Sequence, residues 1–146
     1  MVVVIDANVV ISAALTPQGL IADTIFSNSS KVQFIAPAFI VAEIKANESR
    51  ICMKNKIDIA EFKQNLLLLI SRVIIIEDDD ISDEIFKKAF ELTKTIDTKD
   101  TIYIALAILF DALFWTGDLK LLRTLKRKGY NQIITTPDLK QILKGI

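Results

Sequence analysis

Residues 97–122, DTKDTIYIALAILFDALFWTGDLKLL, are the stretch from which the rest of the fold can be worked out. The stretch begins with two carboxylates three residues apart, Asp97 and Asp100. An apolar run follows over residues 102–110, which is long enough for about three helical turns. The next apolar residues, 113–115, predict a short strand.

The same stretch then reaches Thr116, Gly117 and Asp118, ahead of a basic amphipathic segment. If the apolar helix lies antiparallel to the strand that it feeds, its N-terminal end is level with the C-terminal end of that strand. Asp97, Asp100 and Asp118 would then meet at one edge of a sheet. This geometry predicts a metal site.

Composition limits the function classes. The chain has 146 residues, which fits one domain, and its formal net charge is zero. Binding of nucleic acid would therefore need a local basic patch. The absence of histidine excludes His-based acid–base chemistry and the usual zinc ligand sets. Cys52 is the single cysteine, so no internal disulfide forms, and with no histidine to activate it we do not expect a nucleophile.

The hydropathy pattern predicts a soluble, cytoplasmic protein with no membrane segment. The longest apolar runs, residues 66–70 and 102–110, fall short of the roughly 20 residues that span a bilayer. The first residues, MVVVIDAN, lack the basic leader, long apolar core and cleavage site of a signal peptide.

Apolar stretches alternate with helical patterns along the whole chain. The expected strands are residues 1–5, 32–35, 73–76, 113–115 and 132–134. The expected helices are residues 9–15, 20–27, 37–53, 58–71, 82–95, 102–110, 119–128 and 136–144. Strands that are uniformly apolar are typical of a parallel sheet buried on both faces. We therefore predict a three-layer α/β/α domain with a mainly parallel sheet of four to five strands.

Several residues predict where helices begin and end. Pro37 suits the first position of a helix, and Asp58 is expected to cap the helix that follows it. Asp80 is a natural cap for the helix at 82–95, and Thr136, followed by proline, for the last helix. Gly129 is placed to end the basic helix.

Five carboxylates map to one edge of this sheet, the edge formed by the C-terminal ends of the strands, where ligands gather in open parallel sheets. They come from four segments of the chain and are Asp6, Glu43, Asp97, Asp100 and Asp118. Like charges within a few ångströms raise each other's pKa, and a divalent cation with oxygen ligands relieves that repulsion. The pattern predicts that these five bind Mg²⁺ or Mn²⁺, with Asn8 and Thr116 orienting a ligand or water.

Each acid also has a simpler interpretation when it is taken alone. Asp97 and Asp100 could be a helix cap and its first-turn partner, and Asp118 could cap the basic helix. Glu43 could be a solvated residue on a helix face. The metal site is favoured because it explains all of them at one edge.

Three other groups of residues do not enter the predicted site. The acidic run at residues 77–80 is interpreted as solvated, because consecutive acids point in different directions. The aromatic residues Tyr103, Phe110, Phe114 and Trp115 are expected in the core. The basic helix could be either a solvated face or a rim that tracks phosphates, and its cations are Lys120, Arg123, Lys126, Arg127 and Lys128.

With these residues in place, the chain resembles the PIN-domain family of metal-dependent ribonucleases. It is most similar to the small single-domain prokaryotic members that often serve as toxins of toxin–antitoxin pairs. The likeness runs over nearly all of residues 1–146. Its motifs are Asp6 after the first strand with Asn8 beside it, the helical Glu43, Asp100 ahead of Ala-Leu-Ala, and Thr116-Gly117-Asp118.

The resemblance implies hydrolysis of RNA phosphodiester bonds, with Mg²⁺ or Mn²⁺ as cofactor. It makes Asp6, Glu43, Asp100 and Asp118 the catalytic acids, and Asp97 an additional acid that some members carry. An antitoxin protein partner and a homodimer are further expectations from the family.

Three other functions are possible. A PIN-like fold without turnover would act as a binding or scaffold module, although the full set of acids argues against it. A phosphatase of the haloacid-dehalogenase type needs an acid two residues after Asp6, where this chain has Asn8. A receiver-type regulatory domain would need an acidic pair after the first strand, which the chain lacks.

Overall fold

A computed structural model describes all residues, 1–146. Its centre is one parallel sheet of five strands in the order β3-β2-β1-β4-β5. The strands are β1 (Val2–Ile5), β2 (Gln33–Pro37), β3 (Val73–Ile76), β4 (Leu113–Trp115) and β5 (Ile133–Ile134). The prediction of a three-layer α/β/α fold with a parallel sheet is confirmed.

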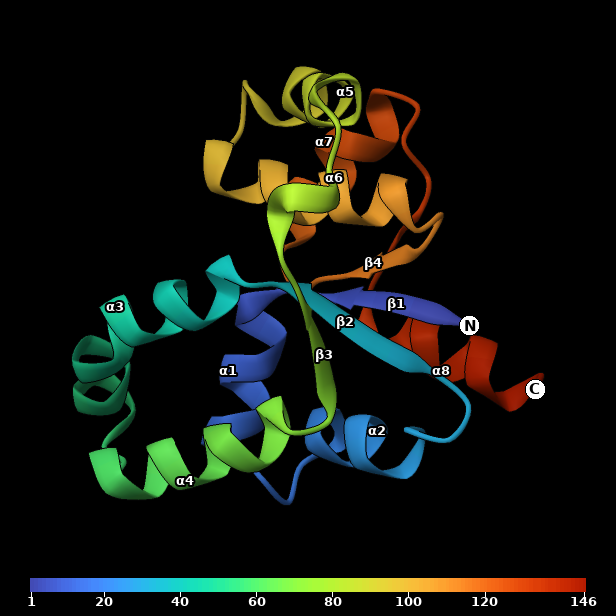
Figure 1. The fold of residues 1–146 in the computed structure, drawn as a ribbon. Coiled ribbons are helices and arrows are strands. Elements are labelled where there is room, and N and C mark those ends of the chain that lie inside the picture. The colour runs from blue at the N-terminus through green and yellow to red at the C-terminus, as the bar shows by residue number, and fades with distance from the viewer.

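Helices cover both faces of the sheet (Figure 1). On one face lie α5 (Asp83–Thr93), α6 (Thr101–Leu109) and α7 (Leu119–Arg127). On the other face lie α1 (Ala7–Leu15), α2 (Leu20–Ser27), α3 (Phe39–Asn55), α4 (Ile59–Ile70) and α8 (Thr136–Lys144). Two short 3₁₀ turns, η1 (Asp78–Asp80) and η2 (Thr98–Asp100), precede α5 and α6.

The strand order places a topological switch point between β1 and β4. The chain runs from β1 outward to β2 and β3, and then returns across the sheet to β4 on the other side of β1. Ile5 of β1 pairs with Trp115 of β4, and the backbone N–H of Asp6 donates to the Trp115 carbonyl at 3.0 Å. The helices that follow these two strands, α1 and α7, lie on opposite faces (Figure 1), and the acidic cavity described below lies at this end of the pair.

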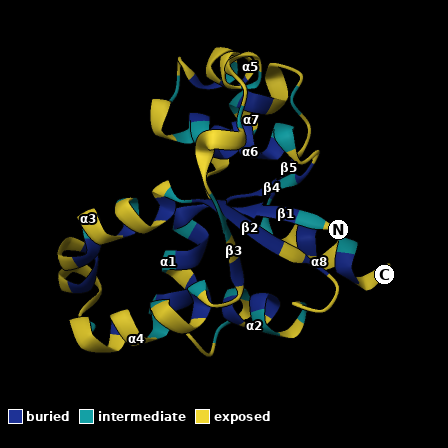
Figure 2. Cartoon of the chain, in the orientation of Figure 1, coloured by how far each residue is buried: buried dark blue, intermediate teal, exposed yellow.

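The core is continuous across both faces of the sheet, as the buried residues of Figure 2 show. Six of the nine residues of α6 are buried, which explains why its sequence is apolar all round rather than amphipathic. The two β4 aromatics pack on opposite faces of the sheet. Phe114 packs on Tyr103 of α6, and Trp115 packs on Phe34 of β2, both with ring centroids 5.9 Å apart. Each such ring contributes about 2–3 kcal/mol by its burial.

Some local predictions are confirmed and others are wrong. The side chain of Asp58 caps α4 by accepting from the Glu61 N–H at 3.3 Å. Pro37 does not begin a helix; it ends β2, because this strand pairs with β3 as far as Ile76 and the helix starts only at residue 39. Asp80 is not the cap of α5, since it lies inside η1 and Ser82 takes that position.

Three further predictions need correction. The last helix is capped by Thr135 and not by Thr136, because Thr135 forms a reciprocal capping box with Asp138. Phe110 is 41% exposed and lies outside the core, since α6 ends at the residue before it. The strand at 73–76 is only partly buried because β3 is the edge of the sheet, and Ile74 is 49% exposed.

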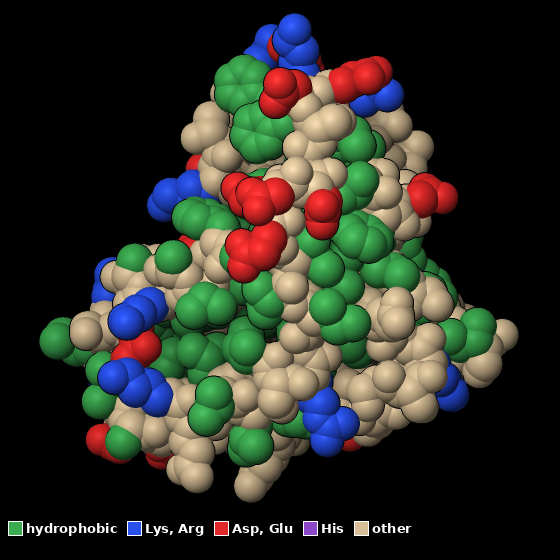
Figure 3. All heavy atoms as spheres, in the orientation of Figure 1, with side chains coloured by type: hydrophobic (Ala, Val, Ile, Leu, Met, Phe, Trp, Pro, Cys, Tyr) green, Lys and Arg blue, Asp and Glu red, His purple; other side chains and the backbone are tan.

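The acidic run at residues 77–80 is exposed, as expected for a solvated segment. Figure 3 shows acidic side chains gathered near the middle of the face that it presents, over the segment that follows β3. None of these four residues lines the acidic cavity described below.

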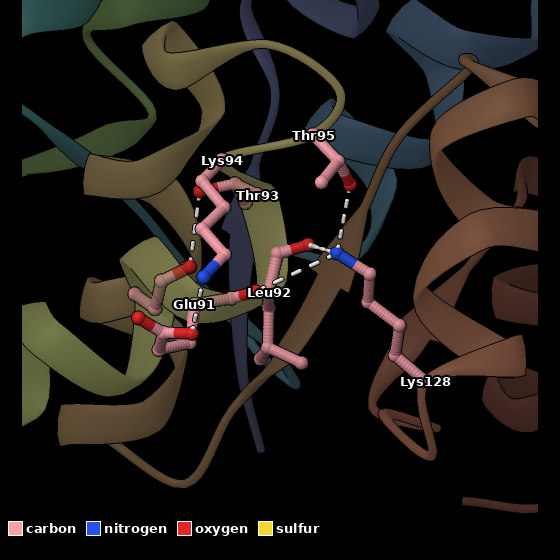
Figure 4. A network of polar contacts seen from close by, with 7 residues as sticks. Glu91, Leu92, Thr93, Lys94, Thr95 and Lys128 are labelled. Carbon is pink, nitrogen blue, oxygen red and sulfur yellow. Dashed lines mark hydrogen bonds and ion pairs between the residues drawn. The ribbon is translucent and has the colours of Figure 1, made fainter.

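The cation at the end of the basic helix has a structural role (Figure 4). The Lys128 Nζ donates to the Leu92 carbonyl and to the Thr95 hydroxyl, both at 2.9 Å. The Leu92 carbonyl belongs to the last turn of α5, where a positive charge is favourable. Lys128 therefore ties the end of α7 to the end of α5.

No single helix is long and apolar enough to cross a membrane; α1 and α2 reach the required length and composition only together, across a bend of 108°.

Gly129 should be sensitive to substitution because its φ of 89° lies in the left-handed region. A Cβ there would touch nothing within 4 Å, so the cost of Gly129→Ala is the backbone strain alone, about 1 kcal/mol. We expect the melting temperature to fall by roughly 3 °C, measured by differential scanning fluorimetry.

Gly145→Ala is the matched control, since Gly145 has φ −89° and an added Cβ would make an ordinary contact of 3.5 Å. Equal melting temperatures for the two variants would contradict the role of Gly129.

Candidate functional site

All five predicted acids line one cavity of about 430 Å³ at the C-terminal ends of β1 and β4. They are Asp6, Glu43, Asp97, Asp100 and Asp118. Asn8 lines the same cavity, whereas Thr116 lies beneath it and is fully buried. The structure thus brings together the acids that the sequence places at one edge of the sheet.

Asp6 follows β1 and is held by a hydroxyl from the neighbouring strand. It is 5% exposed, and its Oδ2 accepts from the Thr116 hydroxyl at 2.6 Å. Thr116 follows β4 directly, so the pairing of Ile5 with Trp115 brings the next residue of each strand together. The position of the carboxylate is therefore set by the register of the sheet.

Asn8 and Thr116 shape the turn that leads to Asp118. The Asn8 Oδ1 accepts from the Gly117 N–H at 3.1 Å, and its Nδ2 lies 3.5 Å from the Thr116 hydroxyl oxygen. That oxygen also accepts from the Asp118 N–H at 3.0 Å. Both residues, which were predicted to orient a ligand or water, contact the protein here, and Thr116 orients the carboxylate of Asp6.

Two of the simpler interpretations also hold. The Asp118 Oδ1 accepts from the Leu121 N–H at 3.1 Å and caps α7. The Asp97 Oδ1 accepts from the Lys99 N–H at 3.0 Å and caps η2. Both residues nevertheless line the cavity, so capping and a place in the site are compatible.

Asp100 differs from the other acids because its side chain makes no hydrogen bond in the structure, and it does not cap α6 with its side chain. Burial first, and then the charges of the other four acids, raise the pKa of Asp100 from 3.8 to about 7. Burial is also the main reason that the pKa of Asp6 rises from 3.8 to about 6. The bond from Thr116 opposes that rise, and the charges of Glu43 and Asp118 add to it.

Glu43 has a partner that the sequence did not reveal. It lies in the second turn of α3, is half-buried, and its Oε1 accepts from the Tyr103 hydroxyl at 2.7 Å. Burial, followed by this bond and the charge of Glu43, raises the pKa of Tyr103 far above its ordinary range, so the phenol stays protonated. The aromatic pattern of α6 indicated a core residue, and only the way in which α6 and α3 meet at the edge of the sheet shows the polar contact.

Two cations also line the cavity, Arg50 of α3 and Lys99 of η2. Lys99 lies between Asp97 and Asp100 in sequence, and Arg50 lies two helical turns beyond Glu43, so the helical period of 3.6 was the signal for it. The cations of the basic helix, for which a solvated face and a phosphate-tracking rim were both open, do not line this cavity.

The donor chemistry of the cavity suits a hard divalent cation, since its acids offer only oxygen ligands and repel one another. The side chains do not form a finished ligand set, however. No three acidic or cysteine side chains of the chain lie where they could hold one metal ion. The residues therefore fit a metal by chemistry, and binding would require the carboxylates to move toward it.

Cys52 is buried in α3, and burial raises the pKa of its thiol. This agrees with the expectation that Cys52 is no nucleophile.

Comparisons with known proteins agree with the fold. The family model described as PIN domain matches residues 4–135. No curated protein matches the chain. Three solved structures are similar in fold. VapBC2 from Rickettsia felis, bound to a DNA fragment from their promoter, has 16% sequence identity and a TM-score of 0.66, and the match covers 92% of this chain and 97% of that chain. PAE2754 from Pyrobaculum aerophilum has 18% identity and a TM-score of 0.70, with 99% and 90% covered, and the PilT N-terminus domain protein SSO1118 from Sulfolobus solfataricus P2 has 16% identity and a TM-score of 0.50, with 95% and 90% covered. At such low identities, these likenesses show the fold.

The raised pKa values of Asp6 and Asp100 predict an unusual pH dependence of stability without metal. Between about pH 4 and pH 7 the folded state holds more protons on these two acids than the unfolded state does. Their contribution to the free energy of unfolding therefore falls as pH rises through this window. Asp100→Asn removes one of the two ionisations.

Thermal melts in EDTA at pH 5 and pH 8 measure this effect. We expect the margin by which the variant melts above the wild type to be clearly larger at pH 8 than at pH 5, because most of the window lies between these two values. An equal change in melting temperature between pH 5 and pH 8 in the two proteins would mean that Asp100 ionises as an ordinary aspartate.

Proposed function

Since the chain belongs to the PIN-domain family, we propose that it is a metal-dependent ribonuclease that hydrolyses RNA phosphodiester bonds. The observation that carries the proposal is the convergence of carboxylates from four segments of the chain in one cavity at the switch point of the sheet. Catalytic residues of open parallel sheets gather at this place.

We assign the catalytic, metal-binding role to Asp6, Glu43, Asp100 and Asp118, with Asp97 as an additional acid beside them. A bound Mg²⁺ or Mn²⁺ would supply a water of lowered pKa and offset negative charge on the phosphate. Asn8 and Thr116 serve this site by fixing Asp6 and the turn before Asp118.

The hydrogen bonds of the acids support this assignment. Asp6, Glu43 and Asp118 each have one carboxylate oxygen bound to the scaffold, by Thr116, Tyr103 and the Leu121 N–H. This arrangement fixes each side chain and leaves a second oxygen for a ligand. Asp100 has neither oxygen bound and is the acid best able to move toward a cation.

RNA as the substrate is supported by the two cations of the cavity. Arg50 and Lys99 are exposed, and they come from two separate elements, α3 and the turn before α6. Cations beside an acidic, metal-binding centre suit a phosphate chain that enters it. A chain of zero net charge needs such a local patch to bind RNA.

The proposal extends to the biological role as a toxin of a type II toxin–antitoxin pair in the cytoplasm. The resemblance of the motifs to small prokaryotic toxins and the fold similarity to VapBC2 of Rickettsia felis support an antitoxin protein as partner. A homodimer is part of the same proposal. The exposed Phe86 and Phe90 on α5 offer an apolar surface that a second copy could cover.

One observation favours a second candidate, a PIN-fold binding module without turnover. No three of the acids form a finished metal site in the structure. The raised pKa values of Asp6 and Asp100 favour the nuclease, because a module with no cation to bind gains nothing from carboxylates that repel one another.

The nuclease proposal is tested by cleavage of a mixed-sequence single-stranded RNA with Mn²⁺ or Mg²⁺. We expect cleavage by the wild type, loss with EDTA, and a fall of at least 100-fold in Asp100→Asn, because second-sphere changes alone often cost about 10–100-fold. Asp111→Asn is the matched control, since Asp111 lies at the other end of α6 and outside the cavity.

Equal activity in the wild type and Asp100→Asn would indicate a contaminating nuclease and sink the assignment. No cleavage by any preparation, with Mn²⁺ binding intact, would favour the binding module.

The role of the cavity cations is tested by Arg50→Gln with Lys99→Gln, which removes two positive charges without adding bulk. We expect the KM for RNA to rise several-fold and the salt dependence of binding to weaken, by a slope of about 0.7 for each phosphate that the protein no longer neutralises. The comparison variant is Arg123→Gln with Lys126→Gln on α7, which should leave both quantities unchanged. The opposite pattern would make α7 the rim that tracks phosphates.

A further inference from the structure

We propose that Tyr103 is a positioning residue of the metal site, which holds the carboxylate of Glu43 in place by its hydroxyl group. The inference rests on the proposed function, since Glu43 needs positioning only if it binds a metal ion. The Tyr103 hydroxyl donates to the Glu43 Oε1 at 2.7 Å and joins residues 60 positions apart in sequence.

The donor is fixed by the core. Tyr103 is 1% exposed, and its ring packs against Phe114 of β4, with the two ring planes tilted by 36°. A buried ring that contacts a central strand cannot follow the movements of a surface side chain. The hydroxyl is therefore a rigid anchor on the α6 side of the cavity.

The acceptor, by contrast, needs an anchor. Glu43 is half-exposed on α3. The neighbouring polar contact stays within this helix, where the Asn47 side-chain amide donates to the Glu43 carbonyl. A glutamate side chain has three rotatable bonds and loses considerable freedom when it is fixed. The bond to Tyr103 engages one oxygen and leaves the other one free for a cation.

The position of Tyr103 in sequence gives the bond a second effect. Residues three apart lie on the same side of a helix, so Tyr103 lies one turn beyond Asp100. One helical turn at the start of α6 thus supplies an acid to the cavity and also the hydroxyl that orients the acid opposite. The contact joins α6 to α3 across the cavity.

The simpler explanation is that Glu43 merely satisfies a buried phenol, as buried tyrosines usually require an acceptor. The two explanations differ in what Tyr103→Phe does. Loss of a satisfied pair would change stability alone, whereas loss of a positioning contact would change the affinity for metal in a protein that is still folded.

The experiment is titration of the protein with Mn²⁺ alone, in which electron paramagnetic resonance reports the free ion. Tyr103→Phe keeps the ring and its packing, and Tyr130→Phe, the same change at the only other tyrosine of the chain, is the matched control. We expect Tyr103→Phe to bind Mn²⁺ about 10-fold more weakly, the effect typical of residues that orient a ligand. The Mn²⁺ concentration for half-maximal cleavage should rise by the same factor, with kcat at saturating Mn²⁺ little changed.

A double-mutant cycle separates positioning from any general loosening of the fold. If Tyr103 acts through Glu43, Tyr103→Phe in a Glu43→Gln background should change Mn²⁺ affinity by less than twofold. An undiminished 10-fold effect in that background would overturn the inference, as would wild-type Mn²⁺ affinity in Tyr103→Phe. In both cases the nuclease proposal would stand. Failure of the wild-type protein to bind Mn²⁺ at all would instead overturn the nuclease proposal and this inference with it.

Discussion

The hydroxyl of Thr116 connects the pairing of the central strands to the acidic cavity. It donates to Asp6 at the end of β1 and accepts from the Asp118 N–H at the start of α7, and it is fully buried. Both contacts depend on the register in which Ile5 pairs with Trp115. A slip of one residue between these strands would turn Thr116 to the opposite face and separate the two acids.

The same arrangement has an electrostatic cost. Asp6 and Asp100 are partly or wholly removed from water and face other carboxylates, so ionising them opposes folding near neutral pH. The hydrogen bond from the Thr116 hydroxyl offsets part of this cost at Asp6. The protein keeps a site that is not optimal for stability, which is common where a ligand is to be bound.

Much of the fold and the placement of the acids could be predicted from sequence, because the patterns that indicate them are local. The uniformly apolar strands indicated a parallel sheet, and Asp58 and Gly129 marked the start of one helix and the end of another. The ends of the strands placed Asp6 and Asp118 at one edge of the sheet. Two of the wrong predictions concern residues whose structure depends on strand pairing between distant parts of the chain. Pro37 became part of a strand because β3 pairs with it, and the edge position of β3 exposes Ile74.

The other contacts of the site could not be predicted from sequence for the same reason. The bond between Tyr103 and Glu43 depends on how α6 and α3 lie across the sheet, and no pattern in either helix encodes that distance. The entry of Arg50 into the cavity depends on the direction in which α3 leaves the sheet. Helical spacing limits which residues can line the cavity, and only the packing of the helices decides which of them do.

The wide spacing of the acids along the chain has a consequence for biosynthesis. Asp6 and Thr116 are 110 residues apart, and Asp118 follows them only after four of the five strands have been made. On a ribosome that adds about 5–20 residues per second, the earlier acids are translated many seconds before their last partner. The cavity cannot close around a cation during that interval. Under the proposed function, a nascent chain would therefore not act on RNA until nearly all of its sheet has assembled.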